Sequence, residues 1–385
     1  MILLLYVVCL KKIKNVKIKP KFALFLKVIC FVLCVFIGIF VFYCKQISQL
    51  TSLNYSKEAS RKILFSKNKD YVLSVGENKT LNLAFESADF NKKYLDNYSK
   101  IKYVNHKDLI KNINNLLKVG YSNSDINLII THGSNDDVIE FAKRDKVRYL
   151  EEFYTLDYAK IKNYDRYVAL SDETGDNEED VVIKVNLDLD KENYTDCVEV
   201  NKFSTDMLVN KHRCLNKEFI PDNLVDIDSK YTSEKNIKIS KIAMNAFIKM
   251  YEAAEKDGYN LVINSAYRSY EDQEEITNEY LSSYGQTYVD KYVAKPGFSE
   301  HQTGLAFDIG SRNSNVFANS KEYGWMQENA YKYGFIYRFD KRYEDLTGFR
   351  SEAWHYRYVG QEIATYIYEH NNMSLEEYFV IFLDK

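Results

Sequence analysis

The chain has 385 residues, long enough for two or three domains, and its net charge of −3 hides an uneven distribution. The first 45 residues contain eight lysines and no acidic residue, whereas the remainder carries 44 basic and 55 acidic residues, a net charge of −11. A basic leader ahead of an acidic body is typical of a membrane-inserted protein. It argues against a nucleic-acid binder, because no later segment forms a basic patch with interleaved aromatic residues.

An apolar segment over residues 22–44 predicts a transmembrane anchor. Residues 28–43 carry no charge and the apolar stretch continues before Lys27, giving about 22 residues, enough to cross a ~30 Å hydrocarbon core. The lysines before it predict a basic cytoplasmic N-terminus over residues 1–21 and a body outside the membrane. A cleaved signal peptide is the alternative, but no small-x-small site follows the apolar run, so we expect an uncleaved anchor.

The six cysteines divide according to this topology. Cys197 and Cys214 lie in the exported body, seventeen residues apart, where they form a disulfide or remain reduced; the sequence leaves both open. None of the cysteines has the spacing of a zinc-binding motif, so a metal site has to use other ligands. The other four lie in, before or at the edge of the membrane: Cys9, Cys30, Cys34 and Cys44.

Residues 45–195 form an extracytoplasmic accessory or spacer region of mixed, partly helical character. Alternating runs at residues 71–75 and 80–83 predict strands, and from His106 onward the apolar spacing predicts short amphipathic helices. We find no long repeat in this region. It either presents the rest of the chain to a polymer such as the wall or is a plain spacer, and the sequence does not separate the two.

Residues 196–385 are predicted to form an α+β domain. Apolar periodicity indicates helices at residues 240–255, 271–284 and 321–333, and a strand at residues 261–263. Helices that alternate with short strands favour a small, largely antiparallel sheet with flanking helices.

Two of the six histidines stand out from the others. His301 precedes Gly304 and an apolar alternation that reads as a strand, with Asp308 inside it. An aspartate there is costly to bury unless it is paired in the core or binds a metal. We interpret the remaining four as incidental residues in polar, exposed settings: His106, His132, His212 and His370.

A second block, Glu352-Ala353-Trp354-His355, opens another tract that favours a strand. Two imidazoles and one carboxylate make a three-ligand catalytic zinc set with one position open, which predicts a site built from His301, Asp308 and His355. Glu352, three residues before the last ligand, can then act as a base.

These blocks resemble the VanY-type D-alanyl-D-alanine carboxypeptidases, zinc peptidases of family M15 with the LAS or Hedgehog-like fold. The resemblance covers roughly residues 206–368 and not the first two hundred. It rests on four segments: Ser299-x-His301-x-x-Gly304-x-Ala306-x-Asp308, Glu352-x-Trp354-His355, Tyr267-Arg268-Ser269-x-x-x-Gln273, and Leu208-Val209-Asn210-Lys211 with Ile220-Pro221-Asp222-Asn223-Leu224.

The resemblance implies that His301, Asp308 and His355 bind Zn²⁺ and that Glu352 is the general base. It also implies that Arg268 faces the substrate, where a fixed guanidinium stabilises an oxyanion or holds a carboxylate. Three further residues become expected substrate contacts: Ser299, Gln273 and Tyr267. The structural alternatives are an exposed loop arginine, a turn-capping serine and a glutamine on a helix surface.

The sequence therefore predicts a membrane-anchored, extracytoplasmic zinc D,D-carboxypeptidase that removes the terminal D-alanine from peptidoglycan stem peptides. Alternatives on the same scaffold are an L,D-carboxypeptidase acting on tetrapeptide stems, a D-Ala-D-Ala dipeptidase and a wall endopeptidase. A non-catalytic wall-binding module is a different class. Retention of Glu352 with all three ligands argues against that class, because a structural zinc site needs no base.

Overall fold

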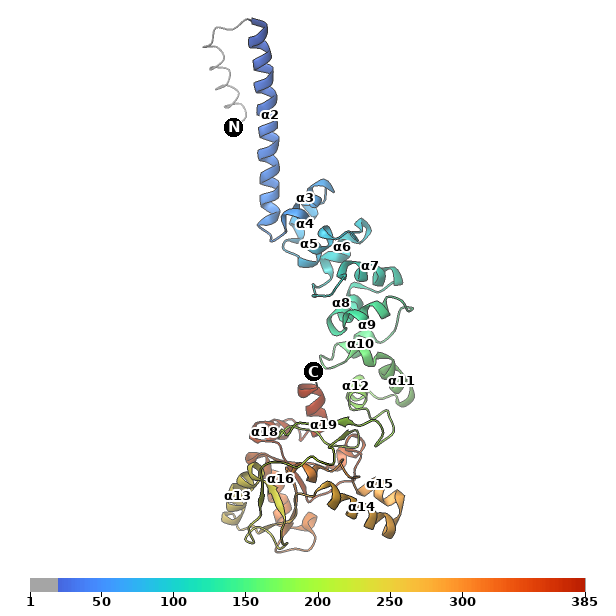
Figure 1. Ribbon diagram of the computed structural model, residues 1–385, viewed down its shortest axis with the longest axis vertical. Helices are drawn as coiled ribbons and strands as arrows, with labels where there is room; N and C mark the ends of the chain where they lie inside the picture. Colours follow the sequence, from blue (N-terminus) through green and yellow to red (C-terminus); the bar gives the residue numbers. More distant parts are fainter. Residues whose placement is uncertain (1–19, 385) are drawn as a thin grey trace. The chain divides into compact units, whose positions relative to one another are not determined.

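The computed structural model describes residues 20–384, which fold as two compact units divided between Glu151 and Glu152 (Figure 1). The predicted basic N-terminus, residues 1–21, lies outside the described residues except for its last two positions. We call the two parts the N-terminal unit and the C-terminal unit and describe each by itself.

The N-terminal unit begins with α2 (Pro20–Thr51), a helix of 32 residues. Its apolar side chains are exposed nearly all round, including Leu24, Phe36 and Phe40. By length and composition the helix is able to cross a membrane, a property that an anchor and a signal sequence share.

The rest of the N-terminal unit is helical in its described residues. The predicted strands at residues 71–75 and 80–83 are wrong, because these segments lie in α4 and α5. The Asn78 side chain caps α5 by accepting a hydrogen bond from the Leu81 N–H at 2.8 Å, and Leu81 and Phe85 are buried at helical spacing. The helices are α3 (Lys57–Phe65), α4 (Lys69–Val75), α5 (Lys79–Glu86), α6 (Leu95–Lys100), α7 (Leu109–Val119), α8 (Asn123–His132), α9 (Asn135–Phe141) and, across the unit boundary, α10 (Leu150–Tyr154).

A buried tyrosine and a buried asparagine hold α6 and α7 together. The Tyr98 hydroxyl accepts a hydrogen bond from the Asn91 N–H at 3.1 Å and donates to the Asn114 side-chain oxygen at 2.6 Å. The Asn114 amide in turn donates to the Asp89 carbonyl at 2.7 Å. We call this arrangement the tyrosine–asparagine clasp. It satisfies polar groups that would otherwise be costly to bury.

The C-terminal unit contains a second clasp with the same connections. The Tyr167 hydroxyl on α11 (Tyr164–Thr174) accepts from the Lys160 N–H at 2.9 Å and donates to Asn186 on α12 (Glu178–Asn186) at 2.7 Å. The Asn186 amide donates to the Tyr158 carbonyl at 2.9 Å. The repeated arrangement is a structural repeat that the sequence analysis did not find.

The C-terminal unit starts before the predicted catalytic boundary at residue 196. Ile183 of α12 is buried in one cluster with Leu208 and Ile336, which joins the second clasp to the predicted catalytic part. Where the catalytic domain itself begins stays a prediction. Cys197 and Cys214 form a disulfide beside the parallel pair β1 (Val198–Glu199) and β2 (Arg213–Cys214).

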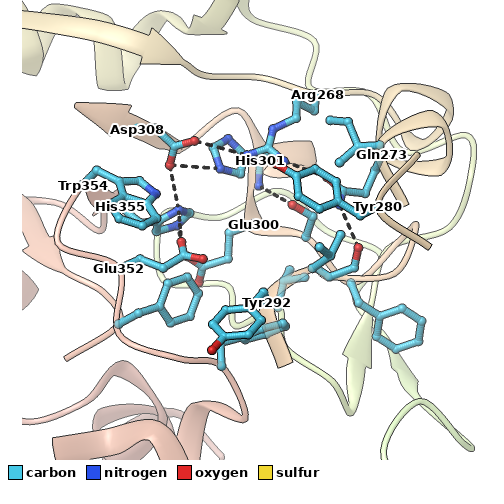
Figure 2. A pocket seen from close by; sticks show the side chains of 18 of the residues that line it. Arg268, Gln273, Tyr280, Tyr292, Glu300, His301, Asp308, Glu352, Trp354 and His355 are labelled. Carbon is cyan, nitrogen blue, oxygen red and sulfur yellow. Dashed lines mark hydrogen bonds and ion pairs between the residues drawn. The ribbon is translucent and has the colours of Figure 1, made fainter. Parts of the chain in front are cut away.

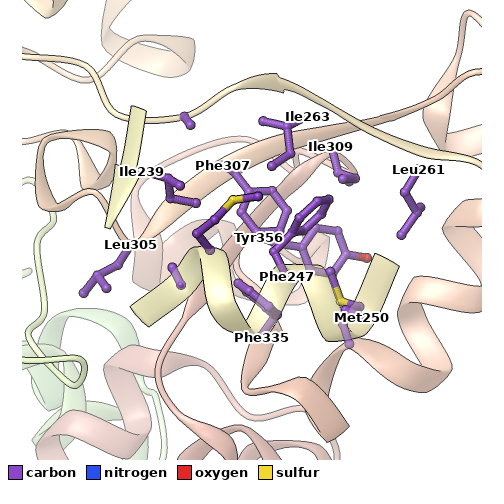
Figure 3. Packing of buried hydrophobic residues seen from close by; sticks show 14 of the residues in the cluster. Ile239, Phe247, Met250, Leu261, Ile263, Leu305, Phe307, Ile309, Phe335 and Tyr356 are labelled. Atoms are coloured by element: carbon purple, nitrogen blue, oxygen red, sulfur yellow. The ribbon is translucent and has the colours of Figure 1, made fainter. Parts of the chain in front are cut away.

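The centre of the C-terminal unit is an antiparallel four-stranded sheet in the order β5-β6-β8-β7. Helix α13 (Lys241–Lys256) packs against it, with the ring of Phe247 5.3 Å from that of Phe307 and Met250 in the same core (Figure 3). The predicted α+β class with a small antiparallel sheet is confirmed. The strands are β5 (Leu261–Ser265), β6 (Ala306–Ser311), β7 (Phe335–Tyr337) and β8 (His355–Tyr358), with β3 (Leu224–Asp226) and β4 (Lys238–Ser240) as a separate antiparallel pair.

Helices flank this sheet at the positions that the sequence indicates. The predicted helices at 240–255, 271–284 and 321–333 correspond to α13, α14 and α16 with the 3-10 turn that follows it. The bounds are α13 (Lys241–Lys256), α14 (Tyr270–Tyr284), α15 (Gln286–Tyr292), α16 (Lys321–Asn329), α17 (Glu344–Thr347), α18 (Gln361–Glu369) and α19 (Leu375–Tyr378), followed by a π-helical turn at Phe379–Leu383.

Candidate metal centre

Strand register places two of the predicted ligands side by side. Asp308 in β6 is the partner of His355 at the start of β8. The Asp308 Oδ1 and His355 Nδ1 atoms are 3.2 Å apart. Adjacent antiparallel strands thus bring together two residues 47 positions apart in the chain.

His301 reaches the same point from a 3-10 turn, Glu300–Thr303, that precedes β6. Gly304 ends the turn in the left-handed region, with φ of 67°, and a Cβ atom there would lie 2.9 Å from a methyl group of Leu224. Only glycine fits this bend without strain. The turn directs His301 Nε2 to within 3.5 Å of Asp308 Oδ1.

The three predicted ligand atoms fit a tetrahedral metal ion. His301, Asp308 and His355 each offer one atom, and these atoms lie within 4.8 Å of one another. Bonds of about 2.0–2.1 Å at tetrahedral angles place ligand atoms about 3.3 Å apart, close to the two distances above. Two nitrogens and one carboxylate oxygen leave a fourth position free.

Both imidazoles are held with one nitrogen directed to this point. The His301 Nδ1–H donates to the Ala266 carbonyl at 2.6 Å, which leaves Nε2 for a metal. The His355 Nε2–H donates to the Glu300 carboxylate at 3.2 Å, which leaves Nδ1. Such partners fix the tautomer and the ring orientation of metal-binding histidines.

The three ligand residues shift one another's pKa values. Burial lowers the pKa of His301 to about 4, so this imidazole is neutral at pH 7. Burial acts in the same direction on His355, but hydrogen bonds to Asp308 and Glu300 outweigh it and raise the pKa of His355 to about 9. Burial would raise the pKa of Asp308, yet the two imidazoles hold it well below its usual value.

The ligands open into a cavity of about 400 Å³, lined also by Arg268, Gln273 and Glu352. Glu352 comes from the loop before β8, and its carboxylate lies 3.8 Å from His355 Nδ1. Burial raises the pKa of Glu352 to about 7, against the opposing effect of His355. Arg268 and Gln273 lie on the opposite side of the cavity from Glu352 (Figure 2).

Residues 236–361 match the family model described as VanY: D-alanyl-D-alanine carboxypeptidase. This chain contains a VanY-type peptidase domain. Among similar proteins is one named "Putative carboxypeptidase YodJ" from Bacillus subtilis, 45% identical over 181 residues, which covers 45% of this chain and 66% of that protein. Another is a D-alanyl-D-alanine carboxypeptidase from Enterococcus faecalis, 41% identical over 138 residues, covering 34% of this chain and 51% of that protein.

The chain thus spans about half to two thirds of the length of these curated relatives. A solved structure of the LdcB LD-carboxypeptidase has 39% sequence identity and a TM-score of 0.45, and the match covers 49% of this chain and 92% of that chain.

In the VanY-type domain, Arg268 is held by two neighbours. Its Nη1 donates to the Gln273 side-chain oxygen at 3.0 Å, and its Nη2 donates to Asp308 Oδ2 at 3.3 Å. Gln273 is buried and also donates to the Ala294 carbonyl at 2.7 Å. The alternative of a surface glutamine is wrong, and Gln273 positions the guanidinium that lines the cavity.

Ser299 and Tyr267, the other two expected substrate contacts, lie in different places in the VanY-type domain. Ser299 lines the cavity, and its hydroxyl accepts a hydrogen bond from the His301 N–H at 3.4 Å, so it also caps the turn. Tyr267 is partly buried and is not among the residues that line the cavity. Contact of Ser299, Gln273 and Tyr267 with a substrate stays a prediction.

The expectation that the other four histidines are exposed holds only for His370, and His106 and His132 are half-buried. His212 is buried, with its Nε2 3.1 Å from the Asn193 side-chain oxygen, and not exposed. It does not line the cavity of the VanY-type domain, and neither do His106, His132 or His370.

A buried ionic network behind His355 was missed by the sequence analysis. Glu300 accepts a hydrogen bond from Arg338 Nε at 2.8 Å, and Arg338 also donates two bonds to Glu376, at 2.9 and 2.6 Å. Arg357 Nη1 lies 3.4 Å from Glu300. Arg338 directly follows β7 and Arg357 lies in β8. A charged residue within or beside an apolar strand was the pattern that indicated Asp308, and the same pattern could have indicated these two arginines.

Proposed function

We propose that this protein is a membrane-anchored zinc D,D-carboxypeptidase that removes the C-terminal D-alanine from peptidoglycan stem peptides. The observation that carries the proposal is the convergence of His301, Asp308 and His355 at one end of an open cavity that also holds Glu352. The name of the Enterococcus faecalis relative, D-alanyl-D-alanine carboxypeptidase, supports the substrate.

Zinc is the metal that these ligands suit best. Imidazole nitrogen and carboxylate oxygen in a three-residue set are typical of catalytic zinc sites. A zinc ion held there would act as a Lewis acid toward both a water molecule and the scissile carbonyl.

The position and the pKa of Glu352 support its assignment as the general base. Its carboxylate faces the metal position from the cavity wall, and burial brings its pKa to about 7, which suits a group that both accepts and releases a proton at neutral pH. It accepts the proton of the attacking water and passes it to the departing amino group of D-alanine.

Arg268 supplies a fixed positive charge beside the metal position. Gln273 and Asp308 hold two of its nitrogens, so the guanidinium is oriented before a substrate arrives. A planar cation in this place binds either the developing oxyanion or the terminal carboxylate of the peptide.

Helix α2 supports the location outside the membrane. It is long and apolar enough to span, and the only charged side chains before it are lysines, which favours a cytoplasmic N-terminus. The disulfide between Cys197 and Cys214 agrees with an exported body, because such bonds persist in oxidising compartments.

The test uses the full chain in detergent, loaded with zinc, and defined stem peptides. Release of a single D-alanine from a pentapeptide stem, read by mass spectrometry, is the expected result. Cleavage of tetrapeptide stems alone would instead identify the protein as an L,D-carboxypeptidase. Cleavage of cross-linked stems alone would identify it as an endopeptidase. A protein that binds no zinc and leaves every stem intact would be a non-catalytic wall-binding module.

A further inference from the structure

Four tyrosines, each four positions from the next, line up along α14 and α15. The ring centroids of Tyr284 and Tyr288 are 4.7 Å apart, and those of Tyr288 and Tyr292 are 4.6 Å apart. Tyr280 lies 5.9 Å from Tyr288, with the two rings inclined by only 8°. We call these four residues the tyrosine ladder.

The tyrosine ladder runs from the catalytic cavity to the protein surface. Tyr280, Tyr288 and Tyr292 line the cavity, and Figure 2 shows Tyr280 and Tyr292 at its edge. Tyr284 is not a lining residue and is 64% exposed, while Tyr280 and Tyr292 are 37% and 44% exposed. In the described part of the chain, none of the four hydroxyl groups has a hydrogen-bond partner.

Helix stability does not account for this arrangement. Aromatic pairs four residues apart stabilise a helix by only about 0.2–0.5 kcal/mol each. The exposed faces of Tyr284 and Tyr292 remain in water, where they contribute no burial free energy. Stacked rings with free hydroxyl groups, continuous with a catalytic cavity, are instead the surface expected for a ligand with both apolar faces and polar edges.

We propose that the tyrosine ladder binds a sugar ring of the glycan strand that carries the stem peptide; the inference rests on the proposed function. An N-acylated amino sugar presents a face of C–H groups and an edge of hydroxyl and amide groups. Tyrosine rings pack against such a face, and their hydroxyl groups bond to its edge. No charged group is needed on either side.

The continuity of the tyrosine ladder with the cavity agrees with this assignment. A fully extended pentapeptide spans at most about 17 Å, so a stem with its C-terminus at the metal position carries its sugar within that reach. The tyrosine ladder begins in the cavity and ends at Tyr284 just outside it. A free pentapeptide carries no sugar, so Tyr284, which does not line the cavity, has no sugar to bind.

The experiment compares one pentapeptide in two forms, free and attached to its wall disaccharide, with the full zinc-loaded chain in detergent. We expect kcat/KM to be about tenfold larger for the disaccharide-linked form, since one tenfold step corresponds to about 1.4 kcal/mol, within the range of aromatic stacking. Tyr284→Ala should lose most of this preference and leave kcat/KM on the free peptide unchanged. Tyr284→Phe keeps the aromatic ring and should retain a large part of the preference for the disaccharide-linked peptide.

Tyr103→Ala is the matched control, because Tyr103 is an exposed tyrosine of the N-terminal unit. It should leave both rate constants unchanged. If Tyr284→Ala lowers kcat/KM equally on the free and the disaccharide-linked peptide, the tyrosine ladder binds the peptide and not the sugar. If the wild-type chain has the same kcat/KM on both substrates, the tyrosine ladder does not bind sugar. Either result overturns the inference.

A binding measurement separates this inference from the proposed function. Peptide-free glycan strands are titrated into the wild-type chain and into Tyr284→Ala, with zinc content as the check on folding. Weaker glycan binding by Tyr284→Ala than by wild type supports sugar binding by the tyrosine ladder, even if no stem peptide is hydrolysed. Absence of hydrolysis would reject only the proposed carboxypeptidase activity. Equal binding, or none, overturns the ladder even if the enzyme is active.

Discussion

Asp308 belongs to two parts of the candidate site at once. Its Oδ1 atom faces both imidazoles, and its Oδ2 atom accepts a hydrogen bond from Arg268. A metal ligand and the substrate-facing cation are therefore positioned by one carboxylate. Moving Asp308 would disturb metal binding and substrate orientation together, which makes it a poor probe of either.

Glu352 is the better probe of chemistry, because it lies beside the ligand set without being part of it. We expect Glu352→Gln to keep one zinc per chain and to lower kcat on pentapeptide stems by about 10²–10⁴-fold, since an amide cannot accept the proton. Glu328→Gln, at an exposed helix position, is the control and should be neutral. Normal turnover by Glu352→Gln with zinc bound would remove Glu352 from the mechanism.

Glu300 tests the support behind His355. Replacing it with glutamine removes the carboxylate that accepts the His355 Nε2–H and leaves Arg338 with less negative charge. We expect zinc affinity, measured by competition with a chelator, to fall about 10–100-fold. Glu322→Gln changes another buried acid, which accepts from Asn260 N–H, and should leave zinc affinity unaltered. Unchanged affinity in Glu300→Gln would mean that His355 needs no such support.

The residues that gather at the candidate site were easier to predict from the sequence than the bounds and types of the secondary-structure elements. The convergence of His301, Asp308 and His355 was predicted because metal chemistry restricts ligand types and because an aspartate inside a strand needs a partner, while their role as metal ligands stays a prediction. Glu300 was not singled out, since its partner Arg338 lies 38 residues further along the chain, and Glu376, the other partner of Arg338, lies another 38 residues on. Contacts of that separation depend on the folded sheet, and one sequence does not reveal them.

Among the secondary-structure elements, apolar alternation predicted a strand correctly in one segment and wrongly in another. Alternation through Leu305, Phe307 and Ile309 correctly indicated β6, whereas similar alternation at residues 71–75 belongs to a helix. Runs of five residues fit either structure, and the surrounding packing decides between them. The residues before β6 supplied Gly304 as a turn signal, while Asn78, the cap of α5, was not recognised.

The tyrosine–asparagine clasp predicts a local loss of stability. Tyr98→Phe removes the hydroxyl that links Asn91 to Asn114 and leaves a buried amide partly unsatisfied, at a cost of about 1–3 kcal/mol. Amide hydrogen exchange at Asn91 should therefore become faster. Tyr94→Phe, on the neighbouring turn, is a matched control because the Tyr94 hydroxyl has no hydrogen bond among the described residues. Equal exchange in both variants would contradict a stabilising role.

At the scale of the whole molecule, the proposed anchor has a simple consequence. If α2 remains in the membrane, the full chain stays in the membrane pellet under alkaline carbonate and is released only by detergent. Protease added to cells without a wall should then digest the body and spare the basic N-terminus. Recovery of a shortened, soluble protein would show that the segment acts as a cleaved signal peptide.

The two clasps, one in each unit, share three connections, and in the second the Asn163 amide also donates to the Asn186 side-chain oxygen at 2.8 Å. Removal of the second clasp would expose apolar residues of the VanY-type domain, because Ile183 of α12 is buried in one cluster with Leu208 and Ile336, whereas the first clasp satisfies its buried polar groups within the N-terminal unit.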